Sequence, residues 1–431
     1  MNVPDSVAAV SPLPLAGVLF VTLAAAAGFS GAIRTAATKL GVVDAPDGGR
    51  KRHRKTTPLW GGVAVTAAFA AGAVLAGRLG LLPAGRRAAD LVAGGPLTGL
   101  LCSAAGFCLV GAWDDAAPMN ARRKLLGMFA ASVPFALLGP AVPRLDLPGV
   151  HWELGAWGPV FAAVWLVGWA NVINLSDGLD GLAGGVGFIA AAALAGHAVI
   201  AGLPAAAVLA GVFAASLAGF LPHNLPMRRA KLFLGDAGSL TVGAVLGMLS
   251  LWASTKTVSG VTAAGVLAAG AVSGFDVFAA IARRKLTGVS VCAADRHHLH
   301  HRLQDRGFSV RKTLAVILSL TALTAAAGLA GAVLDLPWLA PGLCAALFAA
   351  LAGLRVFGHH EAELLRTWLG ATAGAAWQNR PARLRPNLKL VRPPRPAAAP
   401  AREDSALAGG APATVPLPAP STTPAPRRRA A

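Results

Sequence analysis

The chain contains the stretch Trp169-Ala-Asn171-Val-Ile-Asn174-Leu-Ser-Asp177-Gly-Leu-Asp180-Gly-Leu-Ala-Gly-Gly185, which joins two long apolar runs. The run before it covers residues 159–170, and the run after it covers residues 186–200. Both runs have the composition of membrane spans, so the amides and carboxylates between them are expected at the edge of a bilayer. Polar groups are costly there and usually mark function. A plain inter-helix turn needs one Asn or Asp, whereas this one has four.

The composition is that of a membrane protein. Of the 431 residues, 55% are hydrophobic and 13% are charged, whereas a soluble domain carries roughly 25% charged residues. Windows near 20 residues with almost no charge predict an all-α polytopic membrane protein with about eleven transmembrane helices. The predicted spans are 13–31, 59–77, 97–112, 125–142, 159–173, 183–200, 205–221, 240–253, 261–282, 314–334 and 338–356. The short fifth span and the glycine-interrupted eighth have the weakest signals.

The distribution of positive charge predicts the topology. Five alternate loops (32–58, 113–124, 174–182, 222–239 and 283–313) contain 21 Lys and Arg residues, whereas the other five contain 5. The positive-inside rule places the first set in the cytoplasm, with the N-terminus outside the plasma membrane and the C-terminus inside. The net charge of +19 then requires no nucleic acid, because anionic lipids and anionic substrates explain it.

Composition also predicts the domain organisation. Residues 1–357 form the transmembrane domain, and residues 358–377 are a juxtamembrane segment. Residues 378–431 are rich in Pro, Ala and Arg, which predicts a disordered cytoplasmic tail. The four cysteines show neither a CxxC pair nor metal-ligand spacing, so a cysteine metal site is not expected.

Polar clusters follow the third, fifth, seventh and ninth spans, all on the predicted cytoplasmic face. The clusters are Asp114-Asp115, Asn171 to Asp180, Asn224 with Gly235-Asp236-Ala-Gly-Ser239, and Asp295 to Arg302. The opposite loops contain no comparable cluster. Residues from distant segments are therefore expected to build one cytoplasmic site.

These residue types indicate the chemistry of that site. Carboxylates and amide oxygens without cysteine favour Mg²⁺, or Mn²⁺ in its place. The last cluster interleaves four histidines with Arg296 and Arg302. Histidine clusters often bind zinc, and a plain surface run is a further alternative. Arginine among them favours phosphate oxygens. Acidic residues facing a basic patch at a membrane surface predict phosphoryl or phosphosugar transfer to or from a lipid.

The same clusters resemble, in order, the motifs of the polyprenyl-phosphate N-acetylhexosamine-1-phosphate transferases, which form glycosyltransferase family 4. The resemblance runs from about residue 41 to residue 303. The matching motifs are Gly41-Val-Val-Asp44-Ala-Pro46 with Arg50-Lys51, Thr57-Pro58 and Gly61-Gly62; Asp114-Asp115 with Lys124; Asn171-x-x-Asn174-x-x-Asp177-Gly-x-Asp180-Gly; Asn224 with Lys231-x-Phe-x-Gly235-Asp236-x-Gly238-Ser239; and Asp276 with Asp295-Arg296-x-His298-x-His300-His301-Arg302. The ordered set is far more specific than any one motif.

The resemblance implies a reaction and a set of roles. Polyprenyl phosphate attacks a UDP-N-acetylhexosamine, UMP leaves, and a polyprenyl-diphosphate-sugar remains in the membrane as the first lipid-linked step of an envelope polysaccharide. Mg²⁺ would be held by Asn174 and Asp236. The implied catalytic residues are Asp114, Asp115 and Asp236. The implied substrate-binding residues are Lys51, Lys124, Asn171, Asp177, Asp180, Asn224, Arg296, His298, His300, His301 and Arg302. A direct transfer and a covalent aspartyl-phosphate route both remain open.

Details of the last motif favour one branch. His297-His-Leu-His300-His301-Arg302-Leu303 is similar to the GlcNAc-1-phosphate branch, whereas the phospho-MurNAc-pentapeptide transferase branch usually has an uninterrupted His triplet. The chain departs from the family at Met128, where a Gln is common. A homodimer is expected by analogy only.

Two other classes are alternatives. A transporter of an anionic solute would place its polar residues near the bilayer midplane, and a membrane anchor would leave the acidic motifs without a role.

Overall fold

The structure is a computed structural model, and it describes residues 11–44, 56–82, 95–142, 144–147, 150–225, 230–254, 267–290 and 297–377. Two predicted site residues, Lys51 and Arg296, lie outside these ranges, as does the predicted tail at 378–431. The description that follows concerns the described part of the chain.

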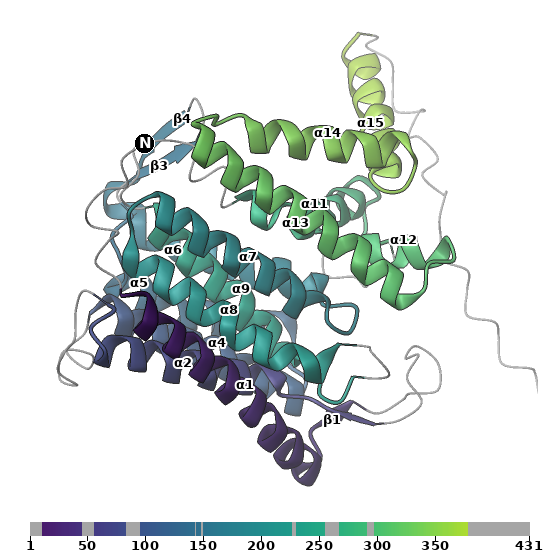
Figure 1. The fold of residues 1–431 in the computed structure, drawn as a ribbon. Helices are drawn as coiled ribbons and strands as arrows, with labels where there is room; N and C mark the ends of the chain where they lie inside the picture. Colours follow the sequence, from purple (N-terminus) through teal and green to yellow (C-terminus); the bar gives the residue numbers. More distant parts are fainter. Residues whose placement is uncertain are drawn as a thin grey trace, which may run out of the picture. The chain divides into compact units, whose positions relative to one another are not determined.

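Helices dominate the fold (Figure 1). Within the described residues a helix lies at each of the eleven predicted span positions: α1 (Pro12–Leu40), α2 (Gly61–Arg78), α4 (Pro96–Ala116), α5 (Ala121–Leu138), α6 (Gly158–Ser176), α7 (Leu182–Ile200), α8 (Pro204–Asn224), α9 (Gly235–Ser254), α11 (Ala271–Leu286), α13 (Val310–Leu334) and α14 (Leu339–Gly353). Eight helices in these ranges are long and apolar enough to cross a membrane. The protein is therefore an all-α polytopic membrane protein.

The other three helices are either too charged or too short to meet the length and composition expected of a membrane span. α5 carries Arg122, Arg123 and Lys124 near its start. α11 and α14 have 16 and 15 residues as described, and a spanning helix needs about 20. The sequence-based number of eleven spans therefore stays a prediction.

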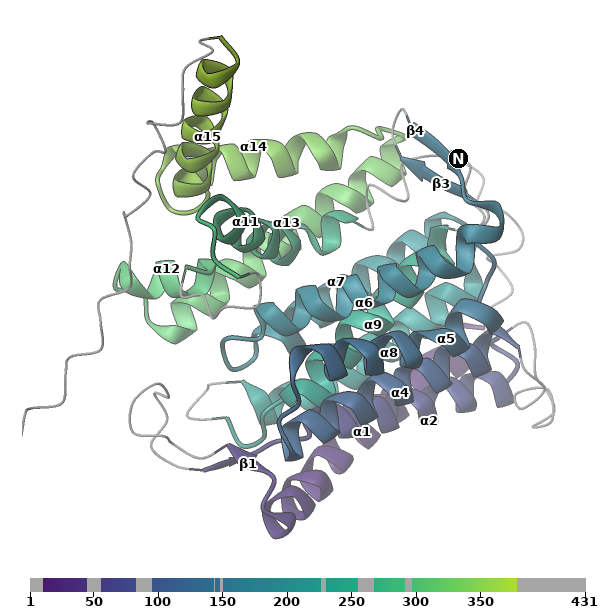
Figure 2. The same ribbon diagram turned by 180° about the vertical axis from the view of Figure 1, so that it is seen from behind.

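The remaining elements are short. β1 (Val43–Asp44) pairs antiparallel with β2 (Thr57–Pro58), and β3 (Arg144–Leu147) pairs with β4 (Val150–Glu153), which is followed by the 3₁₀ turn η2 (Gly155–Trp157). Two non-spanning helices, α12 (Leu299–Asp305) and α15 (His359–Trp377), complete the described chain. Figures 1 and 2 both show β1 and α12 at the end of the bundle opposite the β3–β4 hairpin.

Helix α9 lies at the centre of the bundle and packs against α2, α4, α6, α7 and α8. Its most apolar window is 89% buried, whereas no other candidate span exceeds 67%. In a bilayer, helices associate through close packing of small residues. A Cβ at Gly62 of α2 would lie 2.0 Å from the backbone nitrogen of Gly238, and one at Gly243 would lie 2.3 Å from the carbonyl oxygen of Trp169. These glycines let the backbones of α2 and α6 touch α9.

The glycines of the eighth predicted span do not interrupt it, and α9 is continuous from Gly235 to Ser254. The sequence placed Asp114, Asp115 and Asp236 in loops outside the spans, and this detail was wrong. Asp114 and Asp115 lie in the last turn of α4, and Asp236 lies in the first turn of α9. Hydropathy made the predicted spans shorter than α4 and α9 because it treats every charged residue as lying outside a span. These carboxylates are instead held by contacts inside the fold.

Candidate active site

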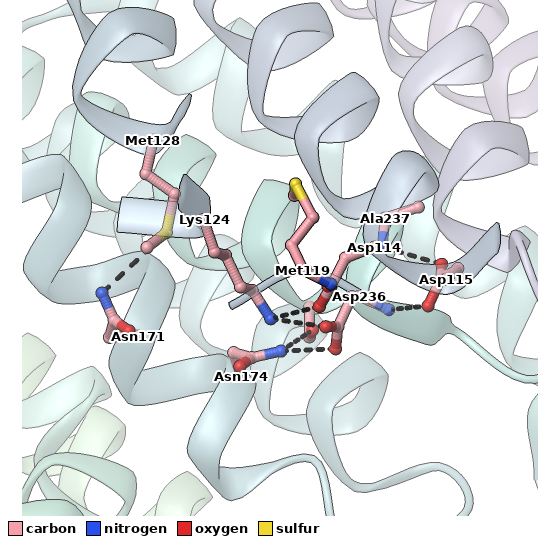
Figure 3. A network of polar contacts seen from close by, with 10 residues as sticks. Asp114, Asp115, Met119, Lys124, Met128, Asn171, Asn174, Asp236 and Ala237 are labelled. Carbon is pink, nitrogen blue, oxygen red and sulfur yellow. Dashed lines mark hydrogen bonds and ion pairs between the residues drawn. The ribbon is translucent and has the colours of Figure 1, made fainter. Parts of the chain in front are cut away.

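The carboxylate of Asp236, in α9, is the centre of a polar network that includes residues of α4, α5 and α6 (Figure 3). Its Oδ1 accepts a hydrogen bond from Asn174 Nδ2 of α6 at 2.7 Å, and its Oδ2 pairs with Lys124 Nζ of α5 at 2.5 Å. Asn174 Nδ2 also donates to Ser239 Oγ at 2.8 Å. Lys124 and Asn174 both point toward Asp236 in Figure 3. Three residues predicted for the site from different segments therefore meet.

Lys124 connects Asp236 to a second carboxylate. Its Nζ lies 3.1 Å from Asp114 Oδ2, at the end of α4. Asp114 Oδ1 accepts a hydrogen bond from the backbone N–H of Met119 at 2.5 Å, which closes the short turn between α4 and α5. One ammonium group thus neutralises part of the charge of two carboxylates, and it fixes the spacing between them.

Asp115 binds backbone rather than side chains. Its Oδ1 accepts the N–H of Asp236 at 2.8 Å, and its Oδ2 accepts the N–H of Ala237 at 3.1 Å. The first N–H groups of a helix lack internal partners, so Asp115 of α4 caps α9 across the bundle and places Asp236. Gly235 has a φ of +71°, and a Cβ there would lie 2.5 Å from Asp115 Oδ2. The glycine of the motif is required both for its backbone conformation and for this contact.

The loop between α6 and α7 brings further acid to the network. Burial, together with the negative charges of Asp236, Asp180 and Asp115, raises the pKa of Asp177 to about 8. A group with this pKa is protonated at neutral pH and becomes charged only as the pH rises through about 8. Asp177 can therefore donate a hydrogen bond at pH 7, which an ionised carboxylate cannot do.

The His-rich motif begins at a buried acid of α11. Asp276 Oδ2 lies 3.0 Å from His298 Nδ1, and its Oδ1 accepts the backbone N–H of Leu299 at 2.9 Å. Asp276 thereby holds the start of α12 and orients the ring of His298. A carboxylate that binds one ring nitrogen sets the tautomer of an imidazole and leaves the other nitrogen for a ligand.

His300 lies against the loop of the central motif. Burial and the neighbouring His301 and His298 together lower its pKa to about 3, so the ring is neutral at pH 7. It lines a small pocket between α6, α7, α11, α12 and α13, and its ring packs on that of His301 with centroids 4.1 Å apart. Within the basic patch that the sequence predicts, His300 can therefore offer an N–H donor but no charge.

Gly178→Ala tests the contact between these two motifs. A Cβ at Gly178 would lie 2.4 Å from Cε1 and Nε2 of His300, so the imidazole must move. Small displacements of binding groups can cost about 10²-fold in rate, and we expect a 10- to 100-fold loss of activity with a nearly unchanged melting temperature. Gly168→Ala is the control, because a Cβ there meets nothing within 4 Å. Equal activities of the two variants would contradict a role for His300.

Several predicted substrate contacts are used by the protein itself. Asn224 is buried, its Oδ1 accepts the N–H of Gly181 at 2.8 Å, and its Nδ2 donates to the carbonyl of Leu232 at 3.1 Å. Asn171 Nδ2 donates to the carbonyl of Val167 at 2.8 Å and lies 3.9 Å from Met128 Sδ, at the position where the family often has Gln. These two amides connect and orient the motifs.

Arg302 is also engaged inside the protein. Its Nη2 lies 2.9 Å from Glu361 Oε1 of α15, and its Nε donates to the carbonyl of His297 at 2.9 Å. The guanidinium is 9% exposed. The structure thus places Asp114, Asp115, Lys124, Asn174 and Asp236 in one network, with Asp177 electrostatically coupled to it, whereas His298 and Arg302 are bound to Asp276 and Glu361.

The sequence reasoning did not assign some residues that shape the site. Ser239 shares the Asn174 amide with Asp236. Trp60 has a φ of +73° and donates from Nε1 to the carbonyl of Ala112 at 3.1 Å, one turn before the carboxylates of α4. A Cβ at Gly111 would lie 2.2 Å from the carbonyl oxygen of Asp236. The presence of Ser239 and Gly61-Gly62 in the motifs was the available signal; nothing in the sequence singled out Gly111.

The donors present fit a hard divalent cation. Among the described residues, no group of three or more His, Cys, Asp or Glu side chains forms a ready metal cage. Mg²⁺ usually takes only one or two protein carboxylates and completes its shell with water and phosphate. Asp236 and the neighbouring Asn174 supply oxygens of that type, because rotation of the amide would present Oδ1 in place of Nδ2. The residues therefore fit Mg²⁺ better than a soft metal.

Several known proteins are similar to this chain in sequence. A sequence model described as glycosyl transferase family 4 matches residues 97–254. A probable undecaprenyl-phosphate N-acetylglucosaminyl 1-phosphate transferase of Bacillus subtilis is 32% identical over 287 residues, which cover 66% of this chain and 76% of that protein. The decaprenyl-phosphate N-acetylglucosaminephosphotransferase of Mycobacterium tuberculosis is 31% identical, over 67% of this chain and 75% of that protein.

An undecaprenyl-phosphate alpha-N-acetylglucosaminyl 1-phosphate transferase of Escherichia coli is likewise 31% identical, over 68% of this chain and 78% of that protein. The matches cover most of each relative, and the family match begins in α4 and ends in α9, the helices that carry Asp114, Asp115 and Asp236. The chain therefore belongs to glycosyl transferase family 4, in the branch of these polyprenyl-phosphate N-acetylglucosamine-1-phosphate transferases.

Proposed function

We propose that the protein transfers N-acetylglucosamine-1-phosphate from UDP-N-acetylglucosamine to polyprenyl phosphate. The observation that carries the proposal is the network around Asp236, where acids, an amide and one lysine converge from α4, α5, α6 and α9. The relatives in the same branch are named for this acceptor lipid and this sugar.

The reaction is a phosphoryl transfer. An oxygen of the polyprenyl phosphate attacks the β-phosphorus of the UDP-sugar, the bond from that phosphorus to the bridging oxygen breaks, and UMP leaves with the electron pair. A phosphate monoester has its second pKa near 6, so the attacking oxygen is already ionised at pH 7. No strong base is needed, and catalysis is mainly positioning and electrostatic stabilisation. This favours direct transfer over an aspartyl-phosphate route.

The named residues divide these tasks. Asn174 and Asp236 would hold Mg²⁺, which when bound would neutralise charge on the donor diphosphate and on the departing UMP. Lys124, bound between Asp114 and Asp236, would face phosphate oxygens. Asp115 fixes the start of α9, and protonated Asp177 offers a hydrogen bond to the uridine or the sugar.

We further infer that the site lies at the cytoplasmic face of the plasma membrane. The helix ends that carry the motifs are those whose connecting loops hold 21 of the 26 loop lysines and arginines, and such loops stay in the cytoplasm. Eleven spans with the N-terminus outside and the C-terminus inside are consistent with that placement. Nucleotide sugars are cytoplasmic metabolites, so both the donor and the membrane lipid acceptor can reach this face.

A transfer assay tests the function. Purified full-length protein in detergent should convert labelled UDP-N-acetylglucosamine and polyprenyl phosphate into a labelled lipid and UMP when Mg²⁺ is present. With a chelator the product should fall to background, and Mg²⁺ or Mn²⁺ should restore it. A panel of UDP-N-acetylhexosamines reports the sugar specificity. Absence of lipid product with every donor would refute the proposal.

A further inference from the structure

Glu361, in the first turn of α15, is a buried acid between two arginines of other elements. Its Oε1 lies 2.9 Å from Nη2 of Arg302 in α12 and also pairs with Nη1 of Arg283 in α11. All three side chains are 11% exposed or less. Its position lies more than a hundred residues after the family-matched stretch 97–254, and no proposed step uses it.

The same segment makes other contacts with the His-rich helix. The guanidinium of Arg302 lies 5.1 Å from the ring centroid of Phe357, which is a cation–π distance. Arg306, just after α12, donates from Nη2 to the backbone carbonyl of Arg355. Residues 355–361 therefore bind one side of α12, and Asp276 of α11 binds its start.

α12 has only seven residues, and a helix of this length is not stable without tertiary contacts. Its position therefore depends on its tertiary contacts, which include the buried Leu299 and Leu303 and the groups that hold its two ends. Removing one partner of a buried ion pair leaves an uncompensated charge, which is strongly unfavourable. Loss of Glu361 would leave two arginines with like charges side by side, and α12 would have to move to solvate Arg302.

We propose that Glu361 is a positioning residue for the His-rich motif and that Arg302 acts through this contact instead of gripping substrate phosphate. The inference rests on the proposed function and on the expectation, from the family resemblance, that His298, His300 and His301 bind the donor. The C-terminal helix α15 is then part of the machinery that binds the nucleotide sugar, although it contributes no atom to the substrate.

Glu361→Gln in the full-length protein tests this role, with Glu363→Gln as the matched control on an exposed position of the same helix. For Glu361→Gln the KM for UDP-N-acetylglucosamine should rise about tenfold or more, and the KM for polyprenyl phosphate should stay unchanged. Glu363→Gln should match the wild type. A purely structural role would lower the active fraction and leave both KM values unchanged, and that result would overturn the proposal.

A double-mutant cycle with Arg302→Gln separates indirect from direct roles of the arginine. If Arg302 acts through Glu361, the double variant should be no worse than the more impaired single variant, because the two changes remove the same contact. Multiplied losses would assign Arg302 to the substrate and refute the proposal. If Glu361→Gln does not fold, Glu361→Asp, which keeps the charge on a shorter side chain, should still show the selective rise in donor KM, and an unchanged donor KM would refute it.

The two proposals fail in different ways. An inactive wild type refutes the transferase function, whereas an active wild type with an unaffected Glu361→Gln variant refutes only the positioning role. The thermal stability of the four cycle proteins supplies a readout that does not require activity. Coupling of Glu361 and Arg302 in that cycle is expected, and additive changes would contradict the contact.

Discussion

Asp236→Asn is expected to lower the turnover number at least about 10³-fold while the protein remains folded. Asparagine keeps the shape of the side chain but removes its charge, so Lys124 loses one of its two carboxylate partners and the proposed cation loses its charged ligand. Asp236→Ala should show the same loss. Initial rates in the lipid transfer assay, at saturating donor and acceptor, measure the effect.

The folded state should tolerate the change at Asp236 well. The carboxylates of Asp236 and Asp114 lie on either side of Lys124, so removing the charge of Asp236 relieves repulsion between those two groups. The charge of Asp236 is also the largest electrostatic influence on the pKa of Asp177 after burial. The pKa of Asp177 should then fall, and thermal stability should be equal or higher. Asp335→Asn, far along the chain in a different turn, is the isosteric control. Near wild-type turnover of Asp236→Asn would remove Asp236 from the metal site.

Asp115→Ala is expected to lower activity about 10²-fold and to destabilise the protein by about 2 kcal/mol. Two backbone N–H groups at the start of α9 lose their acceptor, and each unsatisfied donor costs about 1–3 kcal/mol, less where water can reach it. Asp236 is attached to one of those groups, so its carboxylate loses its fixed position. The melting temperature and the transfer rate measure the two effects separately.

The asparagine variant at the same position distinguishes capping from proton transfer. Asp115→Asn retains one acceptor oxygen, so it can keep one of the two N–H groups bound and should fall between wild type and Asp115→Ala in both measurements. Asp305→Ala, an exposed acid of α12, is the control. If Asp115→Asn were as inactive as the alanine variant yet fully stable, Asp115 would act as a proton acceptor and not as a cap.

The sequence predicted the positions of the helices well because a membrane span is recognised by its apolar composition, which is visible in the sequence. Helices occur at all eleven predicted positions within the described ranges. The helix ends were less accurate, and the reason is specific. Asp115 of α4 accepts the backbone N–H of Asp236 of α9, and this contact holds both acids within their helices. A hydropathy window has no information about a partner 121 residues away.

The residues of the network around Asp236 were predictable from the sequence, but the partners that hold the His-rich motif were not. Asp114, Asp115, Lys124, Asn174 and Asp236 were all expected from the ordered motifs, and the structure brings them together. Arg302 was expected to face phosphate because it lies in a His-rich motif, yet it is paired with Glu361 from outside every motif. Residue type and local spacing reveal a functional segment, whereas they do not reveal which side chains the fold uses to hold that segment.

The contact between α2 and α9 limits how the enzyme can move. The backbones meet at Gly62 and Gly238, and Gly61 and Gly62 donate to the carbonyls of Phe233 and Leu234 at 2.9 Å each. Sliding these helices would break main-chain hydrogen bonds with no side chain to absorb the shift. Conformational changes that admit nucleotide sugar and release UMP should therefore arise near the seven-residue α12, where Asp276 binds the N–H of Leu299 and Glu361 binds Arg302.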